Sequence, residues 1–169
     1  MMRSEHNVSA ATRSLDIRLW HELGLTGNPI PVTIPLEGDS MRPLIRRGRD
    51  HVTIVPLNRE LKIGDIVLFH SGGERYVVHR VWKLKDGMVQ TLGDNCWNPD
   101  AWMPLESVWG LAVRMERDGR KYILDSRWSR VFGRIWMGIY PIRMRYRRLC
   151  QLAGGIVRRL GRGHKNDHE

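Results

Sequence analysis

Short, largely apolar runs of the kind that form β-strands lie between residues 31 and 124. Turn-forming Gly, Asp and Asn residues separate these stretches from one another. Seven runs follow this pattern: PVTIPL, HVTIVP, DIVLFH, RYVVHRVWKL, MVQTL, SVWGLAV and RKYIL. Because no long helical pattern interrupts them, we expect a mainly β fold built on a coiled antiparallel sheet.

The two ends of the chain have helical periodicity instead. Leu15, Leu19 and Leu23 are spaced four residues apart, which predicts a short amphipathic helix over residues 10–24. In the last part of the chain, apolar residues recur every three or four positions with arginines on the remaining face. Pro141 divides this pattern, so we expect two amphipathic helices, or one helix kinked there. The predicted organisation is a helical extension (1–28), a β domain (29–125) and a basic amphipathic tail (126–169).

The net charge of +10 comes almost entirely from this tail. Residues 127–169 hold 11 of the 28 Lys and Arg residues but only two of the 18 acidic residues. Residues 1–126 are therefore close to neutral, with 17 basic and 16 acidic side chains. An anionic partner would thus bind the tail rather than the β domain.

Several expectations concern the compartment. Cys96 and Cys150 form neither a disulfide framework nor a metal-binding pattern, so a reducing compartment is expected. The first residues lack the basic-then-apolar order of a secretory signal. The longest early uncharged run, residues 23–36, has 14 residues and three prolines, whereas a membrane span needs about 20 apolar residues. We expect a cytoplasmic protein with no signal peptide or transmembrane helix, and with no metal or cofactor.

The stretch EGDSMRPLI, residues 37–45, is the first candidate for chemistry. An extended apolar run precedes Ser40, and Pro43 restricts the backbone after it, so the hydroxyl would lie at a rigid corner. Gly38, Asp39 and Met41 complete this turn. Because such residues also form ordinary surface turns, a purely structural serine is an equally weighted alternative.

A serine is a weak nucleophile unless a base removes its proton. His79 is the best candidate base, because it interrupts the otherwise apolar run YVVHRV, where its surroundings would tune its pKa. The alternative is a buried histidine that is bonded to a backbone carbonyl. The segment TLGDNCWNPDAW supplies two carboxylates, Asp94 and Asp100, either of which could orient the histidine.

Four motifs in this order, GDSMRP, GDIVLF, YVVHRV and LGDNCWNPD, resemble the signal-peptidase family of serine proteases. The resemblance covers roughly residues 31–115. Within the family, the chain resembles more narrowly the branch that uses a histidine, as in the endoplasmic-reticulum and archaeal signal peptidases. It implies the coiled β scaffold that this family shares with the self-cleaving repressor peptidases. It also implies that Ser40 is the nucleophile and His79 the base, with Asp100 as the third triad member and Asp94 as its structural neighbour.

Three features depart from the family pattern. The usual amino-terminal membrane anchor is not expected here. Gly38 stands where a hydroxyl can help to stabilise the oxyanion in the lysine enzymes, so backbone N–H groups, chiefly that of Ser40, would do this work. GDSM also resembles the repressor and mutagenesis-protein peptidases, but those use a lysine base, and Lys83 and Lys85 are displaced from position 79.

The predicted function is a serine endopeptidase that cleaves leader-like or signal-like peptides by acyl transfer. The resemblance implies a preference for small residues before the cleaved bond. One alternative is a catalytically weak peptide-binding or membrane-docking module on the same fold. A self-cleaving regulator is a variant of the first hypothesis, and it would need a cleavable segment within the first 25 residues.

Two hypotheses for the tail carry equal weight. As a peripheral anchor, it would contact an anionic membrane surface through Trp128, Phe132, Ile135, Trp136, Arg130 and Arg134. As a helix pair, it would pack its apolar stripe against the β domain and leave its arginines in solvent. Nucleic acid is the least favoured partner, because the basic residues lie on helices rich in Trp and Ile without a known binding motif.

Overall fold

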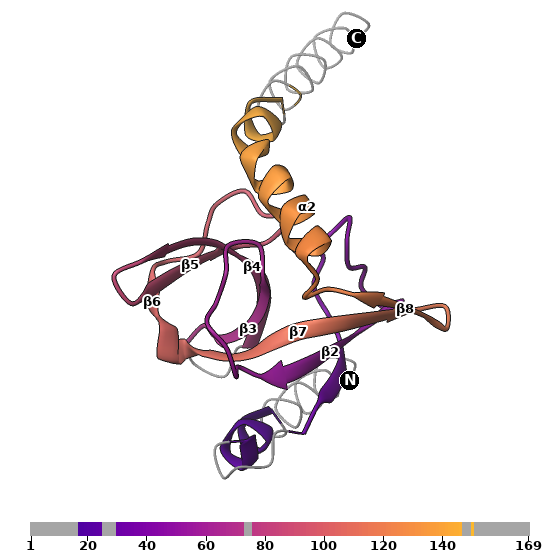
Figure 1. Ribbon diagram of the computed structural model, residues 1–169. Helices are drawn as coiled ribbons and strands as arrows, with labels where there is room; N and C mark the ends of the chain where they lie inside the picture. Colours follow the sequence, from indigo (N-terminus) through magenta and orange to yellow (C-terminus); the bar gives the residue numbers. More distant parts are fainter. Residues whose placement is uncertain (1–16, 25–29, 73–75, 147–149, 151–169) are drawn as a thin grey trace, which may run out of the picture. The chain divides into compact units, whose positions relative to one another are not determined.

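The computed structural model describes residues 17–24, 30–72, 76–146 and 150, and the chain divides into two units, residues 1–134 and 135–169. In the described part of the first unit, eight strands form one antiparallel sheet (Figure 1). The strands are β1 (Val32–Pro35), β2 (Asp50–Pro56), β3 (Ile66–His70), β4 (Tyr76–Lys85), β5 (Met88–Leu92), β6 (Met103–Pro104), β7 (Val108–Arg117) and β8 (Arg120–Ile123). A short 3₁₀ helix, Leu105–Ser107, connects β6 to β7.

The sheet has the order β1-β2-β7-β3-β4-β5-β6, and β8 pairs with β7. It curls into a half-barrel, as Figure 1 shows, and this confirms the predicted mainly β, coiled antiparallel fold. Irregular pairing at Thr53/Ile54 and Leu68/Phe69 accompanies the curl on the two strands that flank β7. The seven runs that the sequence predicts as strands all form strands. The sequence did not predict β6, because two residues are too few to show an alternating pattern.

Strand β3 is buried on both faces of the sheet. Ile66 and Leu68 belong to one apolar cluster, whereas Val67 and Phe69 belong to a second. The curled sheet covers both sides of this strand, which explains why the run IVLF has no polar residue between its apolar ones. Neighbouring residues of β3 therefore belong to different apolar clusters, because strand side chains alternate between the two faces. The same alternation determines how residues of the candidate site are placed.

Residues 17–24 are helical, within the predicted range, but the helix packs through side chains other than the expected stripe. Leu19 and Leu23 are exposed, and Leu15 lies outside the described residues. Trp20 enters the first apolar cluster and donates its indole N–H to the carbonyl of Ile30 at 2.6 Å, while His21 stacks on Trp109 at 4.1 Å. An indole buries more apolar area than a leucine and brings its own hydrogen bond, so the tryptophan determines which face packs.

Helix α2 (Arg127–Gly138) begins the tail. A turn at Ile139 ends it, and residues 140–146 are helical again, so the predicted division near Pro141 is present. Pro141 falls in the first turn of the second segment, where its missing N–H costs nothing. The later part of the predicted stripe (Leu149, Ala153, Ile156, Val157 and Leu160) lies outside the described residues. In the part of the chain that the structure describes, no helix has the length and apolar character to cross a membrane.

The first half of α2 packs on the sheet through its polar and glycine face. The backbone of Arg130 approaches Gly64, and Arg134 donates to the carbonyl of Ile63 at 3.2 Å. Gly133 lies against the side chain of Arg80, where a Cβ would come within 2.7 Å of a guanidinium nitrogen. For residues 127–134 the structure therefore contradicts the hypothesis that the apolar stripe packs against the β domain, because glycine gives the closest approach on the other face.

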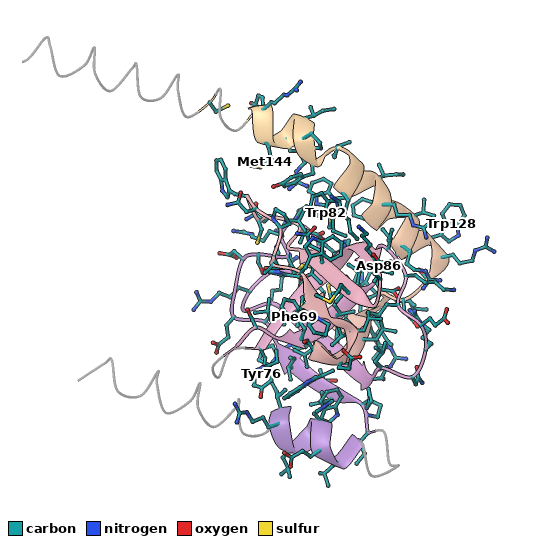
Figure 2. The ribbon with its side chains drawn as sticks, turned by 90° about the vertical axis from the view of Figure 1, so that its left-hand side faces the viewer. Phe69, Tyr76, Trp82, Asp86, Trp128 and Met144 are labelled. Atoms are coloured by element: carbon teal, nitrogen blue, oxygen red, sulfur yellow. The ribbon has the colours of Figure 1, made fainter. Side chains whose placement is uncertain are left out.

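Within residues 127–134, the apolar side chains instead point away from the sheet. Trp128 is 82% exposed, and Figure 2 shows its ring projecting outward from the ribbon. Val131, Phe132 and Ile135 are exposed as well. Exposed apolar side chains gathered in this way are typical of interaction surfaces.

Candidate active site

Ser40 lies in a turn that follows β1 and is held from below by apolar side chains. Met41 and Ile45 are each 1% exposed within the first apolar cluster, and the N–H of Ile45 donates to the carbonyl of Met41 at 2.9 Å. The N–H of Arg42 donates to the carbonyl of Asp39 at 3.2 Å. Ser40 itself is half-buried, and Gly38 and Asp39 are exposed. The serine therefore sits on a fixed turn that remains reachable from solvent.

The far end of this loop is held by a buried carboxylate, Asp50. It accepts two hydrogen bonds from Arg117, at 2.8 and 2.6 Å, and one from the N–H of Arg46 at 2.7 Å. Arg117 also donates to the carbonyl of Leu44 at 2.7 Å. Burial raises the pKa of Asp50, but the bonds from Arg117, Arg46 and Arg49 outweigh burial and lower the pKa to about 2. The loop that carries Ser40 is thus closed by a carboxylate that stays ionised at neutral pH.

Consecutive residues of β4 supply the two charged groups at the centre of the site. Val78 belongs to the first apolar cluster and Val81 to the second, so β4, like β3, has both faces covered. Between them, His79 and Arg80 must point to opposite faces of the sheet, because strand side chains alternate. Both are buried, at 7% and 0% exposed. Each therefore needs a polar partner on its own side.

His79 finds its partner in Asp100. The distance between His79 Nδ1 and Asp100 Oδ2 is 2.7 Å, and Thr91 Oγ1 donates to the same carboxylate oxygen at 2.6 Å. Two further bonds from β5 hold the backbone of Asp100: its N–H donates to the carbonyl of Thr91, and Gln90 donates to its carbonyl, each at 2.9 Å. Asp100 is thus positioned to fix the orientation of the imidazole.

Asp94 has a different partner. Its two carboxylate oxygens accept from Arg80 Nε and a terminal guanidinium nitrogen at 2.9 and 2.8 Å, in a bidentate pair. Arg80 also donates to the carbonyl of Gly64 at 2.9 Å. The two aspartates that the sequence left as alternatives therefore lie on different partners, and it is Asp100 that contacts His79. Asp94 fixes the loop between β5 and Asp100.

That loop brings the serine turn and the histidine together at Gly93. A Cβ on Gly93 would lie 2.9 Å from the carbonyl oxygen of Ser40, 2.9 Å from Nε2 of His79 and 2.5 Å from Sγ of Cys96. Only glycine fits at this point, because the Ser40 carbonyl belongs to backbone and cannot move aside. Asn95 then ties the loop to the turn, since its N–H donates to the Ser40 carbonyl at 2.7 Å and its amide donates to the Asp39 carbonyl at 3.2 Å.

The surroundings of His79 favour its charged form. Burial lowers the pKa of the imidazole, but the hydrogen bond to Asp100 and the contact with Cys96 outweigh burial and raise the pKa to about 9. At neutral pH the folded protein therefore holds an imidazolium at this position. To act as a base, His79 must first lose that proton.

Sequence reasoning missed two residues of the site. Arg80 was a charged residue within an apolar strand, which is itself a signal that a buried partner exists. Cys96 was considered only for disulfides and metals, yet its Sγ lies 3.9 Å from Nε2 of His79. Among the described residues, no group of three or more His, Cys, Asp and Glu side chains could hold a metal ion.

The comparisons with known proteins assign no family to this arrangement: no family model matches the chain, and no curated protein matches its sequence.

The raised pKa of His79 makes folding stability depend on pH. The folded-state pKa is about 9 against an ordinary value of 6.5, so the stabilisation is complete below pH 6.5 and is lost as the pH rises through 9. We expect the free energy of unfolding in urea to fall by up to about 3 kcal/mol between pH 6 and pH 9.5. Asp100→Asn should remove most of this dependence. His51→Gln, which changes an exposed histidine of β2, should keep it. An Asp100→Asn protein that loses as much stability over this range as wild type would contradict the assignment.

Proposed function

We propose that this chain is a serine endopeptidase of the signal-peptidase type, in the histidine-using branch, which cleaves leader-like or signal-like peptides. The observation that carries the proposal is the hydrogen bond between His79 and Asp100, made beside the turn that holds Ser40. A nucleophile, a base and a group that orients the base are the components that acyl transfer requires. The same three residues are the ones that the four sequence motifs select.

In the proposed reaction, Ser40 Oγ attacks the carbonyl carbon of the scissile peptide bond while Nε2 of His79 takes the hydroxyl proton. His79 then gives this proton to the leaving amine, and an acyl-enzyme remains on Ser40. A water molecule, deprotonated by His79, hydrolyses the ester and regenerates the hydroxyl. Asp100 keeps Nδ1 occupied throughout and stabilises the imidazolium that forms.

The charge state of His79 sets the working pH of this reaction. With a pKa of about 9, roughly one imidazole in a hundred is neutral at pH 7 and able to accept a proton. The proposed enzyme would thus be slow at neutral pH and faster in alkaline solution. Asp100 is still partly exposed, so substrate binding that excludes water from it would also change the pKa of His79 and the fraction of neutral imidazole.

The oxyanion site of the proposed enzyme depends on position 38. A Cβ on Gly38 would lie 3.9 Å from both the backbone nitrogen and the Oγ of Ser40, in ordinary contact. A side chain there would therefore lie beside the nucleophile, and wild type presents none. Backbone N–H groups alone would have to stabilise the negative charge of the tetrahedral intermediate.

The exposed side of α2 supports a peripheral contact with an anionic membrane surface. Trp128 and Phe132 lie outward, and exposed arginines at positions 127 and 134 flank them. Aromatic side chains partition into the interfacial region of a bilayer, while arginines attract anionic headgroups by about 1 kcal/mol each. Such a contact would hold the proposed peptidase near membrane-bound substrates.

The first prediction concerns the nucleophile. We expect a serine-reactive acylating probe to label wild type at Ser40, with a rate that rises about tenfold per pH unit between pH 7 and pH 8.5. Ser40→Ala and His79→Gln should abolish labelling, whereas His51→Gln should label like wild type. Labelling is followed by intact mass and located by peptide mapping. A folded wild type that is never labelled and cleaves no peptide of a library with small residues before the cleaved bond would favour the binding-module alternative.

The second prediction adds the missing hydroxyl. Gly38→Ser should raise kcat by about tenfold or more, because a single oxyanion donor is worth about 10²–10³ in kcat in other serine proteases. Gly38→Ala has the same Cβ without the hydroxyl and is the matched control. The two variants are compared at saturating peptide. Equal turnover by the serine and alanine variants would refute the oxyanion argument.

The third prediction concerns the membrane. Wild type should co-sediment with vesicles containing anionic phospholipid, less so in high salt and less so with zwitterionic vesicles. The double variant Trp128→Ala/Phe132→Ala should partition to the vesicles at least about tenfold more weakly. Burying the apolar area of each ring contributes on the order of 2 kcal/mol to the binding free energy. The control double variant Trp102→Ala/Ile123→Ala removes exposed apolar residues elsewhere and should bind normally. Equal binding by both double variants would rule out this face of α2.

A further inference from the structure

His79 contacts Cys96 as well as Asp100, and the proposed hydrolysis does not use the contact with Cys96. Its sulfur lies 3.9 Å from Nε2, which is the imidazole nitrogen that would serve Ser40. The opposite nitrogen, Nδ1, is already engaged by Asp100. The thiol of Cys96 therefore contacts the base His79, which in turn contacts the orienting carboxylate of Asp100. This is the arrangement of an activated cysteine nucleophile.

The histidine has little else to bond with on that side. His79 is only 7% exposed, and among the described residues the Cys96 thiol is the contact that the structure gives to Nε2. A buried imidazole nitrogen needs a hydrogen-bond partner. The thiol is also held close, because Gly93 leaves room for Sγ at a point where any side chain would meet it.

The sulfur is partly open to solvent, as Cys96 is half-buried and free of any disulfide. It belongs to the loop that Asp94 and Asn95 hold in place, so its distance from the imidazole is fixed by two neighbours in sequence. Activated cysteines characteristically combine partial exposure with a neighbouring imidazolium, whereas inert cysteines are buried in apolar surroundings.

We propose that Cys96 is a His79-activated thiol and a modification site for soft electrophiles, chiefly small-molecule disulfides. The proton on Sγ passes to Nε2 in the neutral fraction of His79, or to solvent where His79 is already charged, and the resulting thiolate beside the imidazolium attacks one sulfur of the disulfide. A bond forms between Sγ and that sulfur, the original S–S bond breaks, and the departing thiolate takes up a proton from solvent. No net oxidant beyond the disulfide is needed, and a free thiol reverses the reaction.

A consequence for the serine follows, and this part rests on the proposed function. A group attached to Sγ would occupy the space beside Nε2, where the Ser40 hydroxyl has to reach its base. This withdraws the base from Ser40. The two nucleophiles thus share one imidazole, and modifying the thiol switches off acyl transfer by the serine.

The test of the thiol uses the full chain with Cys150→Ser, which leaves Cys96 as the single cysteine. Alkylation by iodoacetamide at pH 7 is followed by intact mass, for the native protein and for the same protein unfolded in urea. We expect the native protein to react about tenfold faster than the unfolded one, because only the folded chain holds the imidazole of His79 beside Sγ. A native protein that reacts no faster than the unfolded chain would overturn the proposal.

Variants identify the activating group. His79→Gln should slow the native reaction about tenfold, Asp100→Asn should slow it to a lesser degree, and His51→Gln should leave it unchanged. Near-ultraviolet circular dichroism checks that each variant is folded. If His79→Gln does not fold, the Asp100→Asn comparison and the native-to-unfolded ratio remain decisive. A folded His79→Gln protein that is alkylated at the wild-type rate would also overturn the proposal.

The link to the serine is measured separately. Oxidised glutathione should add one glutathionyl group to Cys96, abolish labelling of Ser40 by the acylating probe, and lose both effects on treatment with dithiothreitol. In Cys96→Ala, labelling of Ser40 should not respond to glutathione. A reactive thiol in a protein whose serine never labels would support the thiol site and refute the peptidase. A labelled serine beside an inert thiol would do the reverse.

Discussion

The candidate site depends on one buried ion pair, Arg80 with Asp94. A guanidinium with no exposed surface is costly to desolvate, and the bidentate contact together with a third bond to the Gly64 carbonyl offsets this cost. Removing either partner would leave an uncompensated charge in the interior, which costs about 3–5 kcal/mol in other proteins. The pair therefore fixes the loop after β5 to the centre of β4. Every contact between that loop and the serine turn follows from this attachment.

Because side chains alternate along a strand, two adjacent residues of β4 have different roles in the site. His79 and Arg80 are adjacent in β4, and the two aspartates they contact are six residues apart in one loop. Because the side chains of β4 point to opposite faces, one aspartate holds the loop and the other meets the imidazole. His79 and the ion pair that supports its loop thus lie on opposite faces of the sheet. Neither His79 nor Arg80 can move without moving the backbone of β4.

The strands could largely be predicted from the sequence, because short apolar runs bounded by Gly, Asp and Asn turns indicate strands whether or not they alternate with polar residues. The face on which α2 packs was not readable. Amphipathicity shows that a helix has an apolar side but not where that side goes, and here Gly133 allowed the polar side to approach the sheet most closely. The contacts of Arg80 and Cys96 were equally hidden. They depend on the conformation of the loop from Gly93 to Asp100, which no periodic pattern describes.

The inverted packing of α2 divides its first turns into a locked half and a free half. On the inner side, the backbone of Arg130 leaves no room for a side chain on Gly64, and a side chain on Gly133 would press on Arg80 and so on the ion pair behind the site. The outer side chains, Trp128, Val131 and Phe132, are exposed. Substitutions at these exposed positions add no volume against Gly64 or Arg80, so the surface of the helix can change while the geometry of the site behind it is kept.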